Sequence, residues 1–404
     1  MRNKRLDVLR CIAVLLVLVC HRVNPTRLEA AGRVGVDLFF VLSGFLISGL
    51  LFVEYKRSGS IDFKRFFIRR GLKIYPAFYF FLLITLLYQI LFHQVAPLGR
   101  YLSEIFYVQN YGSLIWGHTW SLAVEEHFYI LLPLFFLLLI RYSSHRTDPF
   151  HAMPRAFLAV AATCLALRVV TVLSTTSAEL QIGKGYRWAS FTTHCRLDAL
   201  FFGVLLGYLY HFRPVVLDKL FDSPKKQFIS AALSGALLSC CLIFPLEGRL
   251  MVTLGLTMLY LGFGLALILC LRVREVLPGP LAKQCNRIGT GLAYVGMYSY
   301  SVYLWHLPFE SWGFSFMTRI LHVQMGRVVG LLFYMTGSIV LGIFLSQLIE
   351  FPILKLRDRI FPAMQAGALR GPRPQGQVEP GPGPRLSVET PLGASASPKE
   401  NPHC

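Results

Sequence analysis

Two ionisable side chains, Arg10 and His21, lie in the first apolar stretch of the chain, RLDVLRCIAVLLVLVCH. An ionisable side chain in an apolar span costs about 2.5 to 3.5 kcal/mol on insertion scales, so such residues usually face a protein interior. A helix turns by about 100° per residue, which puts the two within about 20° of one face and roughly 16 Å apart along the axis. One helix face therefore connects two depths of a predicted polar site.

The composition is that of a polytopic membrane protein. Of 404 residues, 54% are hydrophobic and only 15% are charged, which excludes an ordinary soluble domain. The N-terminus is basic, but no small-residue cleavage site follows His21, so we expect a retained helix and not a signal peptide. The net charge of +19 is explained largely by membrane topology, and no nucleic-acid partner is expected.

Windows of about 17 to 25 apolar residues predict ten spans. They cover residues 7–22, 35–54, 74–92, 119–140, 156–174, 197–211, 228–244, 250–271, 292–311 and 327–349. Lys and Arg number 24 in one alternating set of connecting segments and nine in the other set. Because cytoplasmic segments carry the excess of positive charge, the alternation predicts an all-α protein with both termini in the cytoplasm.

The C-terminal 42 residues differ from the rest of the chain. Residues 1–362 are predicted to form the transmembrane domain, whereas residues 363–404 are rich in Gly, Pro and Ser and predict a disordered cytoplasmic tail. The nine cysteines are scattered, with no pair at metal-ligand spacing. We interpret them as small buried hydrophobes and expect no metal site.

Polar residues gather in the half of the membrane opposite the termini. They lie at the ends of five predicted spans and comprise His21, Asp37, Trp120, Ser121, Glu125, Glu126, Arg196, Asp198 and His306. Acids and histidines there predict a shared substrate cavity, although Asp37, Asp198 and Arg196 equally suit interhelical ion pairs. His21 is the candidate general base, with Glu125 orienting its ring. Glu126 lies about 100° further round the helix, so only one of the two acids is expected to face this cavity well.

The cytoplasmic half carries a different chemistry. The segment DFKRFFIRRGLKIYP contains Arg69, Arg70 and Lys73, and Arg10 lies in the same half of its helix. Guanidinium and ammonium groups suit phosphate oxygens. The alternative is a basic anchor that binds acidic lipid head groups.

Six motifs in order resemble the membrane acyltransferase-3 family of bacterial O-acyltransferases, which modify cell-surface glycans. They are the Arg10 and His21 pair at the R-x10-H spacing, GVDLFFVLSGFLI, RRGLKIYP, TWSLAVEEHFY, RLDALFFG and SYSVYLWHLP. The resemblance covers residues 6 to about 350. Lys73 stands where the family usually has arginine, and Val8 and Cys11 stand where relatives often have glycine.

The resemblance implies that His21 is the catalytic base, that Arg10 borders the acyl-donor path, and that Arg70 and Lys73 contact coenzyme A. It further implies a multi-pass protein of the bacterial cytoplasmic (inner) membrane that transfers an acyl group, most commonly acetyl, from cytoplasmic acyl-CoA to a glycan hydroxyl. Acyl-CoA is then a co-substrate, and no permanently bound cofactor is expected. No fused extracytoplasmic domain follows residue 350, so a stand-alone module is expected.

Several alternatives stay open. An acyl-histidine intermediate fits the residues as well as direct transfer does. A transporter or flippase for an anionic or glycolipid substrate is the rival function, and a non-catalytic glycan-binding protein is a third. Gly44, Gly49, Gly203 and Gly207 suit close helix packing better than the midplane helix breaks of transporters. Neither the acyl group, the acceptor glycan nor the oligomeric state follows from the sequence.

Overall fold

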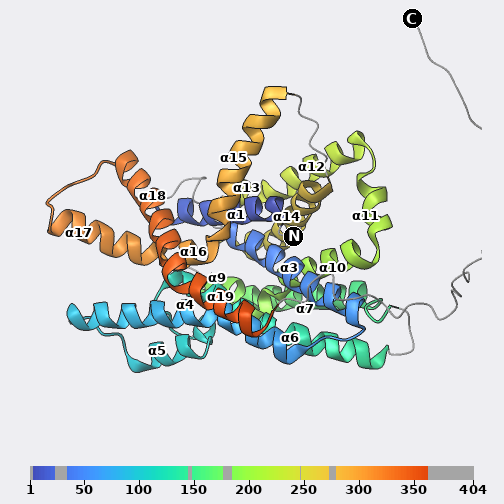
Figure 1. Ribbon diagram of the computed structural model, residues 1–404, viewed down its shortest axis with the longest axis horizontal. Coiled ribbons are helices and arrows are strands. Elements are labelled where there is room, and N and C mark those ends of the chain that lie inside the picture. The colour runs from blue at the N-terminus through green and yellow to red at the C-terminus, as the bar shows by residue number, and fades with distance from the viewer. Residues whose placement is uncertain are drawn as a thin grey trace, which may run out of the picture. The chain divides into compact units, whose positions relative to one another are not determined.

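The computed structural model describes residues 3–22, 34–143, 148–175, 184–245, 247–272 and 279–362. The predicted C-terminal tail lies outside these residues. Within them the chain is helical and contains no strand (Figure 1). The longer helices are α1 (Lys4–Arg22), α3 (Gly35–Ser58), α4 (Phe63–Leu91), α6 (Trp120–Tyr142), α7 (Met153–Ser174), α10 (Leu197–Phe212), α12 (Pro224–Leu238), α14 (Leu256–Arg272), α15 (Gly279–Met297), α16 (Ser299–Pro308), α18 (Arg327–Leu345) and α19 (Phe351–Ile360).

Shorter helices connect these elements. They are α5 (Leu98–Ile105), α9 (Lys184–Phe191), α11 (Pro214–Phe221), α13 (Cys240–Ile243) and α17 (Phe314–Arg319). Three π-helical turns, Met251–Gly255, Phe309–Gly313 and Ser346–Glu350, interrupt the regular α-helical hydrogen bonding. π-Helical turns are uncommon in proteins, and those that do occur often lie at functional sites.

Helices occupy all ten predicted spans, and seven helical stretches in the described part of the chain are long and apolar enough to cross a membrane. The number becomes eight if α10 and α11, which meet at a bend of 98°, form one span. The predicted span 292–311 is not one regular helix, because α15 ends at Met297 and α16 begins at Ser299. The chain is therefore a polytopic helical protein, whereas ten spans and cytoplasmic termini stay predictions.

The basic residues after α3 lie on a helix and not in a loop. We expected the third span to begin at residue 74, but α4 begins at Phe63. The carboxylate of Asp62 accepts a hydrogen bond of 3.0 Å from the backbone N–H of Arg65 and so caps this helix. Arg70 and Lys73 are consequently held on a rigid element.

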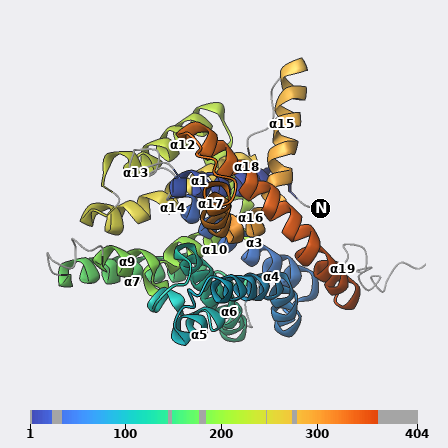
Figure 2. The same ribbon diagram turned by 90° about the vertical axis from the view of Figure 1, so that its left-hand side faces the viewer.

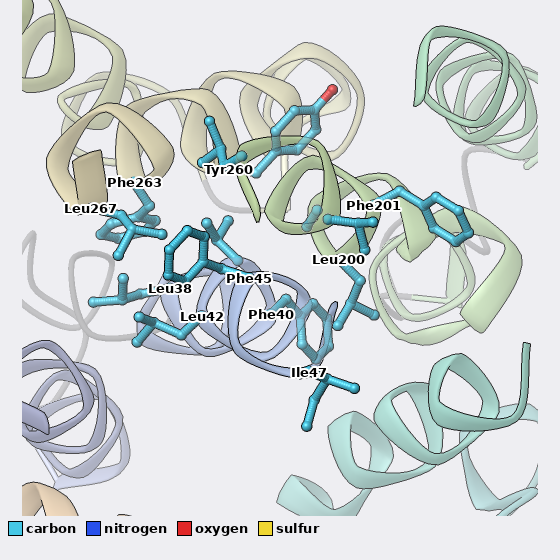
Figure 3. Packing of buried hydrophobic residues seen from close by; sticks show 14 of the residues in the cluster. Leu38, Phe40, Leu42, Phe45, Ile47, Leu200, Phe201, Tyr260, Phe263 and Leu267 are labelled. Atoms are coloured by element: carbon cyan, nitrogen blue, oxygen red, sulfur yellow. The ribbon is translucent and has the colours of Figure 1, made fainter. Parts of the chain in front are cut away.

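Close backbone contacts fix two helix pairs. A Cβ atom on Gly44 of α3 would lie 1.9 Å from the carbonyl oxygen of Leu200 in α10, and one on Gly342 of α18 would lie 2.6 Å from the Cα of Val302 in α16. Side chains around the first contact, among them Phe45 and Leu200, form the main apolar core (Figure 3). The predicted close-packing role of Gly44 is confirmed, because only glycine permits this approach.

The remaining helices group around these pairs. Helix α1 contacts α3, α15 and α16. Helices α4, α5 and α6 lie side by side in both views (Figures 1 and 2). Side chains from α1, α3, α4, α6 and α16 therefore meet between these elements and line two cavities.

Candidate active site

The first cavity has a volume of about 120 Å³ and contains the predicted donor-side cations. Arg10, Arg70 and Lys73 line it. Three carboxyl groups also line it, from Glu125, Glu126 and Glu350. The site is thus a mixed-charge chamber and not a purely cationic phosphate-binding pocket.

Hydrogen bonds and a ring contact hold the walls of this chamber, which we call the inner cavity. The guanidinium of Arg70 lies 3.9 Å from the centre of the Tyr129 ring. The Glu125 carboxylate accepts hydrogen bonds from the hydroxyls of Ser43, at 2.5 Å, and Tyr129, at 2.9 Å. Glu126 accepts one from Tyr75 at 3.1 Å. Both acids line this cavity, which His21 does not line, so the expectation that one of them faces the same cavity as His21 is wrong.

The second cavity, which we call the outer cavity, measures about 770 Å³ and contains His21. His118, Trp120 and Tyr303 also contribute to its lining. The ring of His306, fully buried, lies 4.9 Å from that of His21 and 4.8 Å from that of His118, both edge to face. His306, which the sequence placed in the predicted cavity, thus contacts the candidate base directly.

Backbone carbonyls determine which nitrogen carries the proton in each of these imidazoles. His21 Nδ1 lies 2.9 Å from the Val17 oxygen, His306 Nδ1 lies 2.5 Å from the Tyr303 oxygen, and His118 Nε2 lies 3.1 Å from the Leu304 oxygen. A carbonyl oxygen only accepts, so each of these nitrogens is an N–H donor. His21 therefore presents Nε2 as its basic nitrogen, and the Val17 carbonyl fixes this tautomer.

The inner and outer cavities have two lining residues in common, Val36 of α3 and Tyr303 of α16. The Tyr303 hydroxyl donates to the His118 carbonyl at 2.8 Å and lies 2.6 Å from the Ser121 hydroxyl. These contacts hold the tyrosine in place between the cavities. Arg10 and His21 thus line different cavities with a common wall, whereas the sequence predicted one polar site along the helix face.

Two predicted roles do not fit the geometry. Glu125 does not orient His21, because its carboxylate is held by Ser43 and Tyr129 in the inner cavity, which His21 does not line. Arg69 does not line that cavity either. Its guanidinium donates to the carboxylate of Asp358, at 3.0 Å, and to the Phe361 carbonyl, so it joins α4 to α19.

Asp37, Arg196 and Asp198, three of the remaining predicted site residues, form buried ion pairs. Arg196 donates to Asp37 at 2.6 Å, and Arg168 donates to Asp198 at 2.7 Å. Asp37, Arg196 and Trp120 line a small cavity of about 40 Å³, and Ser121 lines the inner cavity. The interhelical alternative therefore describes both acids, and Asp198 is tied to α7.

The sequence interpretation missed four residues of these sites. Arg168, a fully buried cation in a predicted span, could have been found by its charge alone. His118 lies just before the TWS motif, and Tyr303 lies within SYSVYLWHLP. Glu350 lies at the end of a predicted span and accepts a hydrogen bond from Ser301. Among the residues that the structure covers, no group of three or more His, Cys, Asp or Glu is arranged to hold a metal ion.

The fold and the paired cavities agree with a family assignment. Residues 3–348 match the family model described as an acyltransferase domain (Acyl_transf_3). The chain therefore belongs to this membrane acyltransferase family.

Curated relatives are O-acetyltransferases. The O-acetyltransferase OatA of Staphylococcus aureus is 30% identical over 322 residues, which are 75% of this chain and 50% of that protein. The peptidoglycan O-acetyltransferase OatA of Listeria monocytogenes is 26% identical over 379 residues, 87% of this chain and 55% of that protein. The chain thus spans about half the length of these relatives. No solved structure matches it.

Proposed function

We propose that this protein is an O-acyltransferase of the bacterial cytoplasmic membrane. It transfers an acyl group, most simply acetyl, from cytoplasmic acyl-CoA to a hydroxyl of a cell-surface or exported glycan. Membership of the acyltransferase family and the O-acetyltransferase relatives support the reaction class. Acyl-CoA is a co-substrate in this reaction, and free CoA leaves after each turnover.

The observation that carries the proposal is the state of His21. Its Nδ1 is committed to the Val17 carbonyl, and the ring borders a cavity of about 770 Å³ that could admit a sugar. A base with a fixed tautomer beside a roomy cavity suits general-base catalysis, where the lone pair must face the hydroxyl. His306, in ring contact with His21, is proposed to position it.

The proposed acyl transfer uses His21 first as a base and then as an acid. His21 Nε2 takes the proton of an acceptor hydroxyl while the hydroxyl oxygen attacks the thioester carbonyl, giving a tetrahedral intermediate. The C–S bond then breaks, and the departing thiolate takes the proton from the imidazolium. Attack by His21 itself, followed by transfer of the acyl group from the ring to the hydroxyl, remains the second route.

The inner cavity is the proposed donor site. Arg70 and Lys73 would meet the phosphates of CoA at its entrance, and the uncharged arm would pass Arg10. The carboxyl groups of Glu125, Glu126 and Glu350 argue against phosphate deep inside this cavity. The acyl group must then pass the wall formed by Val36 and Tyr303 to reach His21.

Purified full-length protein in nanodiscs, given [14C]acetyl-CoA and a panel of glycans, provides the test. Acceptor-dependent thiol release and labelled glycan are expected from the parent, and His21→Gln should lower both by at least about 100-fold. His151→Gln, outside both cavities, serves as the matched control. Equal rates in the parent and in folded His21→Gln would refute the proposal.

The rival function is a transporter or flippase with cavities open to alternate sides. It predicts movement of an anionic or glycolipid substrate across proteoliposomes without thiol release. Substrate counterflow that persists in His21→Gln, in the absence of any acetyl transfer by the parent, would favour that rival.

A further inference from the structure

The outer cavity has a distinctive charge. Two arginines line it, Arg100 of α5 and Arg187 of α9, together with His21 and His118. Within the described part of the chain, no Asp or Glu lines this cavity, and neither guanidinium makes a hydrogen bond or ion pair. By contrast, Arg168 and Arg196 are each neutralised by an aspartate.

The placement of Arg100 is unusual against the distribution of charge along the chain. Arg100 is the only Lys or Arg in the segment 93–118, one of the charge-poor segments. Positive charge is generally scarce in segments on the outer side of a membrane. A cation that lines the cavity in such a segment indicates a site for an anionic ligand and not a residue that only makes the surface soluble.

Another cavity, which we call the adjoining cavity, lies next to the outer cavity. It measures about 260 Å³ and is lined in part by Asn110, Tyr111 and Trp188. Both cavities include Gly112, Leu114, Arg187 and Phe191 in their linings, so Arg187 lies where they meet. Aromatic rings and amide groups around two adjoining cavities suit successive units of an oligosaccharide.

We propose that the acceptor is an anionic oligosaccharide whose carboxylate or phosphate binds between Arg100 and Arg187, with a neighbouring sugar unit in the adjoining cavity. This inference rests on the proposed acyl transfer and names the substrate class of the same site. Guanidinium groups bind both anions through paired N–H donors, so the shared chemistry is an oxyanion on a sugar. The hydroxyl to be acylated lies on the His21 side of that anion.

Equilibrium binding to the full chain in neutral phosphatidylcholine nanodiscs tests this inference. The probes are two matched pairs: tetragalacturonate and its methyl ester, and pentamannose 6-phosphate and its dephosphorylated form. At least one anionic probe should bind about tenfold or more tightly than its neutral partner, and 300 mM salt should reduce this preference. Which pair shows the preference distinguishes carboxylate from phosphate.

Arg100→Gln and Arg187→Gln should each weaken binding of the anionic probe by about tenfold and leave the neutral probe unchanged. The matched control is Arg249→Gln. Arg249 is an exposed cation that lines neither the outer cavity nor the adjoining cavity. Equal binding of charged and neutral probes, or an equal loss in Arg249→Gln, overturns the inference. Failure of every probe to bind also overturns the inference, and binding of phosphatidylglycerol to the parent but not to the arginine variants would then identify the arginines as lipid contacts.

The outcome is separable from that of the proposed reaction. If His21→Gln and the parent both prefer the anionic probe while neither transfers acetyl, the binding inference stands and the proposed function fails. If acetyl is transferred equally to charged and neutral acceptors, the function stands and this inference fails.

Discussion

The imidazole rings of His21 and His306 lie 4.9 Å apart in an edge-to-face contact, and the ring of His118 lies 4.8 Å beyond His306. His306 is fully buried, and no partner is found for its Nε2 among the described residues. A buried polar nitrogen without a partner carries a free-energy cost, and its position beside the candidate base makes His306 the candidate positioning residue for His21.

Replacing His306 should separate activity from stability. In His306→Leu we expect turnover to fall by about tenfold or more, because the ring that borders His21 is lost. The KM for acetyl-CoA should change little, because His306 does not line the inner cavity. Steady-state kinetics together with thermal unfolding in detergent check this. A fall in the unfolding midpoint parallel to the loss of turnover would show that the role is only structural.

Removing one member of a buried ion pair should lower the free energy of unfolding. Both Arg168 and Asp198 are essentially inaccessible, so Asp198→Asn leaves an unpaired buried guanidinium and should destabilise the fold by about 3 to 5 kcal/mol. The double variant Arg168→Met/Asp198→Leu should recover most of this. Asp222→Asn is the control, because its pair with Lys226 is half-exposed and is worth under about 1 kcal/mol. Equal unfolding midpoints for Asp198→Asn and Asp222→Asn would contradict this prediction.

The contact between α3 and α10 should not tolerate a methyl group. Gly44→Ala places its Cβ atom against the Leu200 carbonyl and should cost about 1 to 3 kcal/mol of stability, measured by chemical unfolding in detergent. Gly99→Ala in α5 is the matched control, because nothing lies within 4 Å of its added Cβ atom. A Gly44→Ala protein as stable as Gly99→Ala would show that the two helices can separate without cost.

A buried acid outside the candidate spans should make stability depend on pH. Burial raises the pKa of Glu104 from 4.5 to about 7. Its Oε1 accepts hydrogen bonds from the Ile115 N–H and the Thr119 hydroxyl, which only partly oppose the effect of burial. The folded state therefore binds the extra proton, and its contribution to stability is complete below pH 4.5 and is lost as pH rises through about 7.

The shift of the Glu104 pKa changes the free energy of unfolding by up to about 3 kcal/mol. Glu104→Gln keeps an acceptor for both donors and cannot ionise, so it should flatten the fall in the unfolding midpoint between pH 5 and pH 8. Glu54, on α3, provides the control. If Glu54→Gln also flattens the decrease of the unfolding midpoint between pH 5 and pH 8, the decrease comes from the overall charge of the protein and not from Glu104.

We expect Val36, which lines both the inner and the outer cavity, to control the rate of acyl transfer. Val36 lines the inner, outer and small cavities, so Val36→Trp should block passage of the acyl group and lower turnover by about tenfold or more. Val36→Ala should retain or raise turnover with longer acyl chains. Transfer rates with acetyl-CoA and hexanoyl-CoA measure both. Parental rates in folded Val36→Trp would place the acyl path elsewhere.

Much of the helical architecture could be predicted, because apolar length and charged ends are local properties of the sequence. The apolar helices and the close packing at Gly44 follow from residue type and spacing, whereas the sequence showed only that Asp37 and Arg196 suit ion pairs and not that they pair with each other. The role given to Glu125 could not be corrected from the sequence. Topology assigns a residue to one half of the membrane but not to a lateral position, and the sequence does not show that Val36 and Tyr303 separate the two cavities. The partner of His21, the Val17 carbonyl, is a backbone group that no side-chain pattern reveals.

The close contacts at Gly44 and Gly342 also determine how this protein can move. Helices α3 and α10 are locked backbone to backbone, as are α16 and α18, so each pair must shift as one rigid body. Val36 belongs to the first body and Tyr303 to the second. Sliding or tilting of one body against the other would therefore move the two residues of the common wall apart, and we expect a cross-link between α3 and α16 to slow the proposed acyl transfer.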